Sequence, residues 1–206
     1  MFASYWQSYA DTLAWHPTAL QMNQFELLYK LVLAENQRQN LTRITAIADF
    51  WEKHLWDSLL PLVPFFTDIP TTCQLIDVGS GAGFPGLPLA IARPDWSITL
   101  LDSRHKKIAF IDSAIMQLDL TNAKTICTRA ESHQGKYDLI TIRAVGSVHL
   151  CWSYAKPLLA DKGTAILYRG HITDAEIAPI KAQIQQIYSY QTPLTNSQRN
   201  CLYIQN

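Results

Sequence analysis

Near its middle the chain reads Leu75-Ile76-Asp77-Val78-Gly79-Ser80-Gly81-Ala82-Gly83-Phe84-Pro85-Gly86. An apolar run that ends in glycines predicts a buried strand over 74–78, followed by a loop. Half of the chain's eight glycines lie in this loop, where they allow tight turns and a close approach of the backbone to a ligand. Residues 85–92 then predict a helix that ends at Arg93-Pro94. This order is typical of the start of a ligand-binding α/β domain.

Strands and helices continue to alternate after this loop. Apolar runs predict strands over 97–102, 124–128, 137–142 and 163–168, and helical periodicity predicts helices over 108–118, 148–159 and 173–187. Two short strand-like segments, near 187–190 and 201–204, suggest a terminal hairpin with one strand antiparallel. We therefore expect an α/β fold with a doubly wound, mostly parallel sheet.

The first 70 residues read as helices instead. Phe25, Leu28 and Val32 share one helical face. Asp49 and Glu52 resemble a capping box that opens a helix through about residue 60. We therefore expect two parts, with residues 1–70 as an N-terminal helical extension packed on the core and residues 71–206 as the α/β domain.

The composition restricts the class of protein. The 17 basic and 17 acidic residues cancel, which does not suggest a nucleic-acid binder but leaves room for a local basic patch. The longest apolar stretch, over 58–66, contains two prolines and is too short for a membrane span. No basic residue precedes Asp11, which argues against a signal peptide. The four scattered cysteines have no zinc spacing. We expect a cytoplasmic protein without a metal site.

The glycine loop is compatible with two cofactors. The GxGxxG pattern that starts at Gly81 matches the dinucleotide fingerprint. The acidic-x-Gly-x-Gly-x-Gly pattern that starts at Asp77 matches the loop of methyltransferases that use S-adenosylmethionine (SAM). The Asp77 carboxylate would repel a pyrophosphate, whereas SAM carries an ammonium and a sulfonium. Residues 71–92 contain no Lys or Arg to neutralise a phosphate chain. SAM is therefore favoured, and an NAD-linked oxidoreductase remains an alternative.

Further site residues are expected where the carboxyl ends of parallel strands meet. Asp102 ends the second strand and can accept hydrogen bonds from the ribose hydroxyls of either cofactor, or else cap the residues that follow it. Ala130 and Glu131 follow the third strand and would cover the adenine, unless they form a plain surface loop. Arg143 ends the fourth strand, and its guanidinium can hold the carboxylate of SAM or an RNA phosphate.

Five motifs in a fixed order resemble one known family. The chain is similar, over almost its whole length, to the bacterial small-subunit ribosomal RNA guanine-N7 methyltransferases, the glucose-inhibited division protein B family. The segments that carry the resemblance are Asn40-Leu-Thr42, Lys53-His54-Leu-Trp-Asp57-Ser58, the glycine loop, Leu101-Asp102-Ser103 and Ile142-Arg143-Ala144.

The resemblance implies a seven-stranded SAM-dependent methyltransferase domain with an N-terminal helical extension. It implies methyl transfer to N7 of one guanine in the decoding-site region of 16S ribosomal RNA. By position, it assigns Gly79 and Phe84 to the cofactor loop, Ala130 and Glu131 to the adenine side, and Arg143 to the family's strand-end arginine. Gly81 and Asp102 complete the set of expected cofactor contacts.

The RNA side of the site is less well defined by sequence. We expect Asn40, His54 and Arg199 as substrate contacts, and His54 shares a helix face with Asp57. Basic candidates for phosphate contact are Arg38, Arg43, Lys53, Arg104, Lys106, Lys107, Arg129, Arg169 and Arg199. The chain differs from the family's usual sequence at Arg169-Gly170, because members of the family commonly have Lys-Gly after the fifth strand.

Guanine N7 has a free lone pair at neutral pH, so the reaction requires no general acid or base. We therefore expect catalysis by positioning, with no proton-abstracting residue. The target guanine should lie in a loop or an opened element of the RNA. The expected partner is 16S ribosomal RNA or the small ribosomal subunit, and the expected state is a monomer. The alternatives are a SAM methyltransferase for a small molecule and a SAM-binding RNA chaperone.

Overall fold

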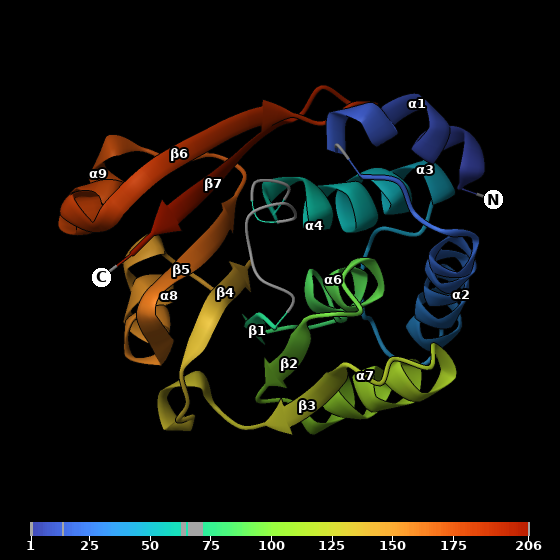
Figure 1. The fold of residues 1–206 in the computed structure, drawn as a ribbon, viewed down its shortest axis with the longest axis horizontal. Coiled ribbons are helices and arrows are strands. Elements are labelled where there is room, and N and C mark those ends of the chain that lie inside the picture. The colour runs from blue at the N-terminus through green and yellow to red at the C-terminus, as the bar shows by residue number, and fades with distance from the viewer. Residues whose placement is uncertain (1, 14, 63–64, 66–71, 206) are drawn as a thin grey trace.

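The computed structural model describes residues 2–13, 15–62, 65 and 72–205, without the side chains of residues 9–11. These residues form a seven-stranded sheet in the order β3-β2-β1-β4-β5-β7-β6 (Figure 1). Strands β1 to β5 pair in parallel, and β7 pairs antiparallel with both β5 and β6. The predicted fold class and the terminal hairpin are confirmed. The strands are β1 (Gln74–Val78), β2 (Ser97–Asp102), β3 (Ala123–Cys127), β4 (Tyr137–Arg143), β5 (Leu159–Arg169), β6 (Ile184–Gln191) and β7 (Gln198–Ile204).

Helices cover both faces of the sheet, because side chains alternate between the faces along each strand. Leu75 of β1 packs in a cluster with α6 (Gly86–Ala92) and α7 (His105–Gln117). Its neighbour Ile76 packs in a second cluster with α8 (Val148–Ala155) and Ile177 of α9 (Asp174–Ile177). The result is a three-layer arrangement with two hydrophobic cores.

The N-terminal helices belong to the first of these clusters. They are α1 (Ala3–Leu13), α2 (Ala19–Asn36) and a helical segment from Ile47 to Leu62, here called the 47–62 helix. The latter comprises α3 (Ile47–Phe50), a π-helical stretch (Trp51–Trp56), α4 (Asp57–Leu59) and a final 3₁₀ turn (Leu60–Leu62).

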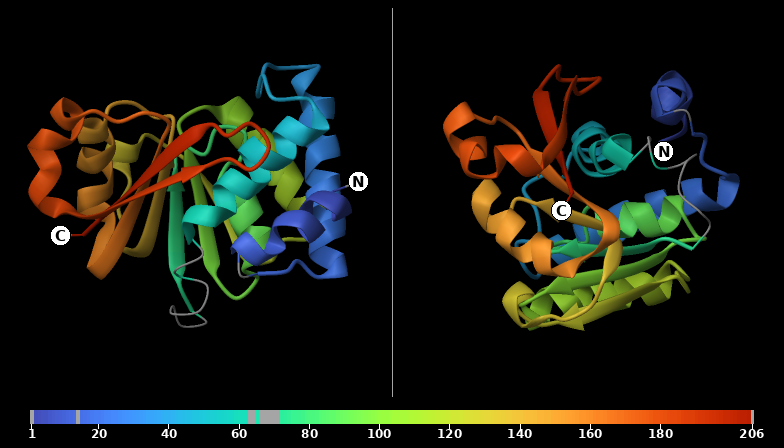
Figure 2. Two further views of the ribbon diagram at one scale, coloured as in Figure 1. Left: turned by 90° about the horizontal axis from the view of Figure 1, so that it is seen from above. Right: turned by 60° about the vertical axis from the view of Figure 1, so that its left-hand side comes forward.

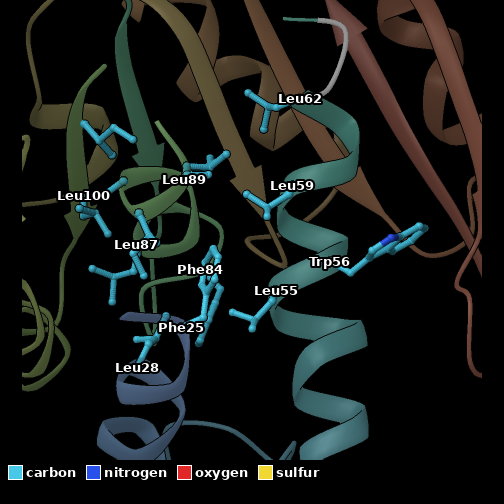
Figure 3. Packing of buried hydrophobic residues seen from close by; sticks show 14 of the residues in the cluster. Phe25, Leu28, Leu55, Trp56, Leu59, Leu62, Phe84, Leu87, Leu89 and Leu100 are labelled. Atoms are coloured by element: carbon cyan, nitrogen blue, oxygen red, sulfur yellow. The ribbon is translucent and has the colours of Figure 1, made fainter. Parts of the chain in front are cut away.

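Figure 3 shows how the N-terminal helices meet the α/β domain. Phe25 of α2 and Leu55 of the 47–62 helix lie around Phe84 of the glycine loop, and Leu87 of α6 lies close by. All four side chains are buried. The N-terminal helices therefore share one core with the sheet. The expected boundary at residue 70 lies outside the described residues.

The C-terminal hairpin holds the 47–62 helix in place (Figure 2). The buried Glu52 carboxylate accepts hydrogen bonds from the backbone N–H groups of Leu194 and Thr195 and from the Thr195 hydroxyl. The Tyr168 hydroxyl donates to the backbone carbonyl of Ser58 at 2.9 Å. Polar bonds therefore fix this helix beside the carboxyl ends of β4 and β5.

Two local predictions are wrong. Helix α9 ends at Ile177, a 3₁₀ segment (Ala178–Gln183) follows, and β6 already begins at Ile184. Pro179 explains the early end, because proline lacks an N–H and clashes with the preceding helical turn. Asp49 and Glu52 do not form a capping box, since the helix begins at Ile47 without a side-chain cap.

Candidate functional site

The glycine loop leaves β1 in a conformation that favours glycine. Gly79, Gly81 and Gly83 have φ values of +76°, +59° and +89°. A Cβ added at Gly81 would have Gly79 O as its nearest neighbour, 3.8 Å away. The position of Gly81 therefore faces open space, where a ligand can approach the backbone.

The Asp77 side chain stabilises this loop through hydrogen bonds. Its carboxylate accepts from the Thr141 hydroxyl at 3.0 Å and from the Gly86 backbone N–H at 3.1 Å. Burial raises its pKa to about 6. The side chain is buried and does not line the cavities described below, so the expected effect of its charge on a ligand stays a prediction. Its role in the structure is to shape the loop.

A first cavity of about 370 Å³ opens between the loop and the ends of β2 and β3. It brings together five of the expected cofactor residues, namely Gly79, Gly81, Asp102, Ala130 and Glu131. Arg104 and Arg129 line it as well, so cations are absent from the glycine loop but present in the neighbouring loops. Tyr154 of α8 was not expected here. Its hydroxyl donates to Glu131 at 3.1 Å.

Asp102 joins the glycine loop to the start of the next segment. Its Oδ2 accepts from the Gly81 N–H and its Oδ1 from the Arg104 N–H, each at 2.9 Å. Capping of the following residues is therefore part of its role. Each carboxylate oxygen can accept a second hydrogen bond, which leaves Asp102 able to bind hydroxyl groups.

A second cavity of about 200 Å³ shares Gly79, Gly81 and Ala144 with the first. Its other lining residues are Leu41, Thr42, His54, Ser80, Ala82, Phe84 and Arg143. The His54 ring stacks on Phe84, with ring centroids 4.1 Å apart and planes 8° from parallel. This stack connects the 47–62 helix to the expected cofactor loop.

His54 is held as one tautomer. Its Nδ1 lies 3.2 Å from Nη2 of Arg143, which can only donate. Nε2 therefore carries the proton and donates to the Thr42 hydroxyl at 3.0 Å. Burial and the charge of Arg143 lower the pKa of His54 well below its ordinary value. The ring is neutral near pH 7.

Arg143 lies between the 47–62 helix and the glycine loop. It also donates to the Lys53 carbonyl at 3.0 Å and contacts Asp57 at 3.5 Å. With His54, these contacts use three of the five guanidinium N–H groups, which leaves two for a ligand as far as the described residues show. His54 and Asp57 are joined through Arg143 and not directly in this part of the chain.

A third cavity of about 430 Å³ continues beyond Arg143, whose side chain lines both this and the second cavity. Arg199, an expected substrate contact, lines it, as does His54. Asn40 is exposed and is not among the described lining residues of any of the three cavities. Its motif neighbour Thr42 lines the second cavity and binds His54 instead. The remaining lining residues are Ile44, Lys53, Asp57, Ala144, Tyr168, Arg169, Gly170, His171 and Tyr190.

The sheet topology and the glycine loop are those of a Rossmann-like fold of the SAM-dependent methyltransferase class. The three cavities adjoin one another at the carboxyl ends of its parallel strands. Solved structures with this fold include precorrin-6Y C5,15-methyltransferases. The C-terminal domain of the enzyme from Rhodobacter capsulatus matches with a TM-score of 0.55 and 14% identity, over 72% of this chain and 88% of that one. The enzyme from Geobacter metallireducens matches with a TM-score of 0.51 and 11% identity, over 66% and 80%.

Residues 21–202 match the family model GidB, described as rRNA small subunit methyltransferase G. Curated relatives named ribosomal RNA small subunit methyltransferase G include those of Thermosynechococcus vestitus and Microcystis aeruginosa. Each is 46% identical, over 97% of this chain and 92% or 95% of the relative. The chain belongs to the GidB family. The predictions of this family and of a SAM-dependent methyltransferase are thereby confirmed.

Proposed function

We propose that this protein transfers a methyl group from SAM to N7 of one guanine in the decoding-site region of 16S ribosomal RNA. The observation that carries the proposal is the row of three adjoining cavities. The first two contain the expected cofactor residues, and the third is lined by cations that suit an RNA backbone. Family membership supports the reaction and the RNA class.

The first cavity fits the cofactor. The open space at Gly81 would be filled by any side chain, as expected for a site where backbone meets ligand. Asp102 has acceptor capacity for the two ribose hydroxyls. Ala130 and Glu131 line the same cavity after the end of β3, where they would flank the adenine. Arg143 has two N–H groups left for the carboxylate of the methionine part.

When bound, SAM supplies a methyl carbon on a sulfonium, which guanine N7 attacks with its lone pair while sulfur leaves with the carbon–sulfur electron pair. No proton moves in this step, so the residues at the site act by binding and orientation. His54 suits this role because it is neutral and held in place from both ring nitrogens. Its stack on Phe84 keeps the glycine loop in position beside the acceptor.

The third cavity is the proposed entrance for the target nucleotide. Its lining includes Lys53, Arg169 and Arg199. Each is paired with one carboxylate and has further N–H groups that can bind phosphates, while the overall charge of the chain is zero. A local basic patch of this kind explains how a neutral protein would bind RNA. No helix among the described residues is long and apolar enough to cross a membrane. A monomeric state and a cytoplasmic location belong to the proposal.

The test is methyl transfer from labelled SAM to two kinds of acceptor. The first is small ribosomal subunits, or their naked RNA, from cells that lack this enzyme, and the second is a pool of small metabolites. We expect label in the RNA alone. Label in the metabolites alone would favour a small-molecule methyltransferase, and binding of SAM and RNA without transfer would favour a chaperone.

A further inference from the structure

The third cavity contains a single acidic side chain among its described lining residues. Asp57 lies there with Lys53, Arg143, Arg169 and Arg199. Cations alone would suffice to bind phosphate groups. A buried carboxylate among them has no such use, because it would repel a phosphate. Asp57 therefore calls for another explanation.

The contacts of Asp57 leave room for a ligand. Tyr190 donates its hydroxyl hydrogen to Oδ1 at 2.7 Å. The two arginines lie farther away, with Nε of Arg199 3.7 Å from Oδ1 and Nη1 of Arg143 3.5 Å from Oδ2. Hydrogen bonds between ionised partners are usually about 2.7–2.9 Å long. A carboxylate can accept about four hydrogen bonds, and the described residues provide one close donor.

We propose that Asp57 reads the Watson–Crick edge of the target guanine by accepting hydrogen bonds from N1–H and the N2 amino group. This inference rests on the proposed function. Two parallel donors on one edge match a carboxylate, whereas adenine offers an acceptor at N1 and no amino group at C2. Asp57 would therefore select guanine over adenine. The target must be unpaired to bind in this way, as expected for a base in a loop.

The same contact leaves the reacting atom free. N7 lies on the major-groove edge of guanine, away from the N1–H and N2 amino groups that Asp57 would hold. Arg143, His54 and Ala144 line both the third and the second cavity, so a base held at Asp57 has an open path toward the glycine loop. N7 can therefore face the cofactor side while the Watson–Crick edge is bound.

The carboxylate also suits the change in charge. Methylation turns a neutral purine into a cation, and its N1–H becomes a stronger donor as the charge develops. A hydrogen bond from N1–H to Asp57 therefore strengthens toward the transition state, which accelerates the reaction as well as selecting the base. The neighbouring arginines would oppose this charge if Asp57 were absent.

The test is a double-mutant cycle that combines removal of the Asp57 carboxylate with removal of the N2 amino group of the target base. Small subunits are assembled with either guanine or inosine at the methylated position, since inosine keeps N7, O6 and N1–H but lacks the N2 amino group. The kcat/KM for methyl transfer is measured at saturating SAM for the wild type and Asp57→Asn. RNA affinity without SAM is measured in parallel for all four combinations.

We expect the wild type to lose about tenfold or more on inosine, the effect of one hydrogen bond to a charged group. Asp57→Asn should lose at least as much on guanine and then distinguish poorly between the two bases. Tyr190→Phe keeps the carboxylate and should keep the preference for guanine. Asp112→Asn is the matched control, because Asp112 lies on α7 away from the cavities and bonds to Thr125.

Three outcomes separate this inference from the proposed function. Equal rates of the wild type on guanine and inosine would overturn the role of Asp57, even if the variant failed to fold. The same inosine effect in the wild type and Asp57→Asn would also overturn it, because a purely structural role lowers both rates equally. Failure of the wild type to methylate guanine would instead refute the proposed function.

Discussion

Replacement of Asp102 by alanine should reduce both stability and cofactor affinity. The structure shows two backbone N–H groups, those of Gly81 and Arg104, bonded to this carboxylate at 2.9 Å. Hydrogen bonds to a charged group contribute about 1.5–3 kcal/mol each. Water can reach both N–H groups in the variant, so we expect the lower part of that range, a total loss of about 3–4 kcal/mol. For a chain of this length, that loss lowers Tm by roughly 5–15 °C.

Two assays separate the effects. Chemical denaturation gives the free energy of unfolding without ligand, and calorimetry gives the SAM affinity, which should fall by about 1–3 kcal/mol as the ribose hydroxyls lose their acceptor. Asp138→Ala is the control. Asp138 also accepts a hydrogen bond from a backbone N–H, that of Gln74, but it lies at the amino ends of the strands, away from the cavities. It should lose some stability and no SAM affinity. Unchanged SAM affinity in Asp102→Ala would show that this carboxylate does not bind the ribose.

Three further predictions concern the same site. Gly81→Val should abolish SAM binding in a protein that still folds, because the side chain enters the space that a ligand needs; calorimetry on the folded variant checks this, and wild-type affinity would contradict it. Arg143→Ala and Arg143→Lys should both weaken SAM binding in the absence of RNA, since lysine lacks the planar fork; wild-type affinity in both would assign Arg143 to the RNA instead. The wild type should lose about 2–3 kcal/mol of stability between pH 4 and pH 7 through Asp77, and Asp77→Asn should abolish this loss. The folded-state pKa of Asp77 is raised to about 6 from an ordinary 3.8, so the wild type loses stability as pH rises between these values, and a denaturation series without that slope would contradict the prediction.

Much of the fold was predictable because its signals are local. An apolar run followed by glycines identified β1 and its loop, and the alternation of strands and helices predicted the parallel sheet. The end of α9 was missed because Ile177, Ile180, Ile184 and Ile187 have helical spacing. Pro179 interrupts the helix, and pairing of β6 with β7 then places Ile184 and Ile187 in a strand.

The sequence predicted which residues form the site but not the contacts between them. All seven expected cofactor residues are glycines, loop residues or residues at strand ends, and the topology brings such positions together at the carboxyl ends of the parallel strands. The partners of Arg143 were not predictable, because His54 and Asp57 lie nearly 90 residues away in the chain. The hydroxyl that donates to the buried Asp77 belongs to Thr141 of another strand. No short motif carries contacts of this kind.

The most direct test of the proposed reaction is to locate the methyl group on the RNA. Small subunits from cells that lack the enzyme are incubated with SAM and the purified protein, and the RNA is then reduced and cleaved at N7-methylguanine with aniline. We expect one new cleavage in 16S ribosomal RNA, at a guanine in the decoding-site region, and one methyl group per subunit. Methyl groups on another atom, scattered cleavage, or no transfer would contradict it.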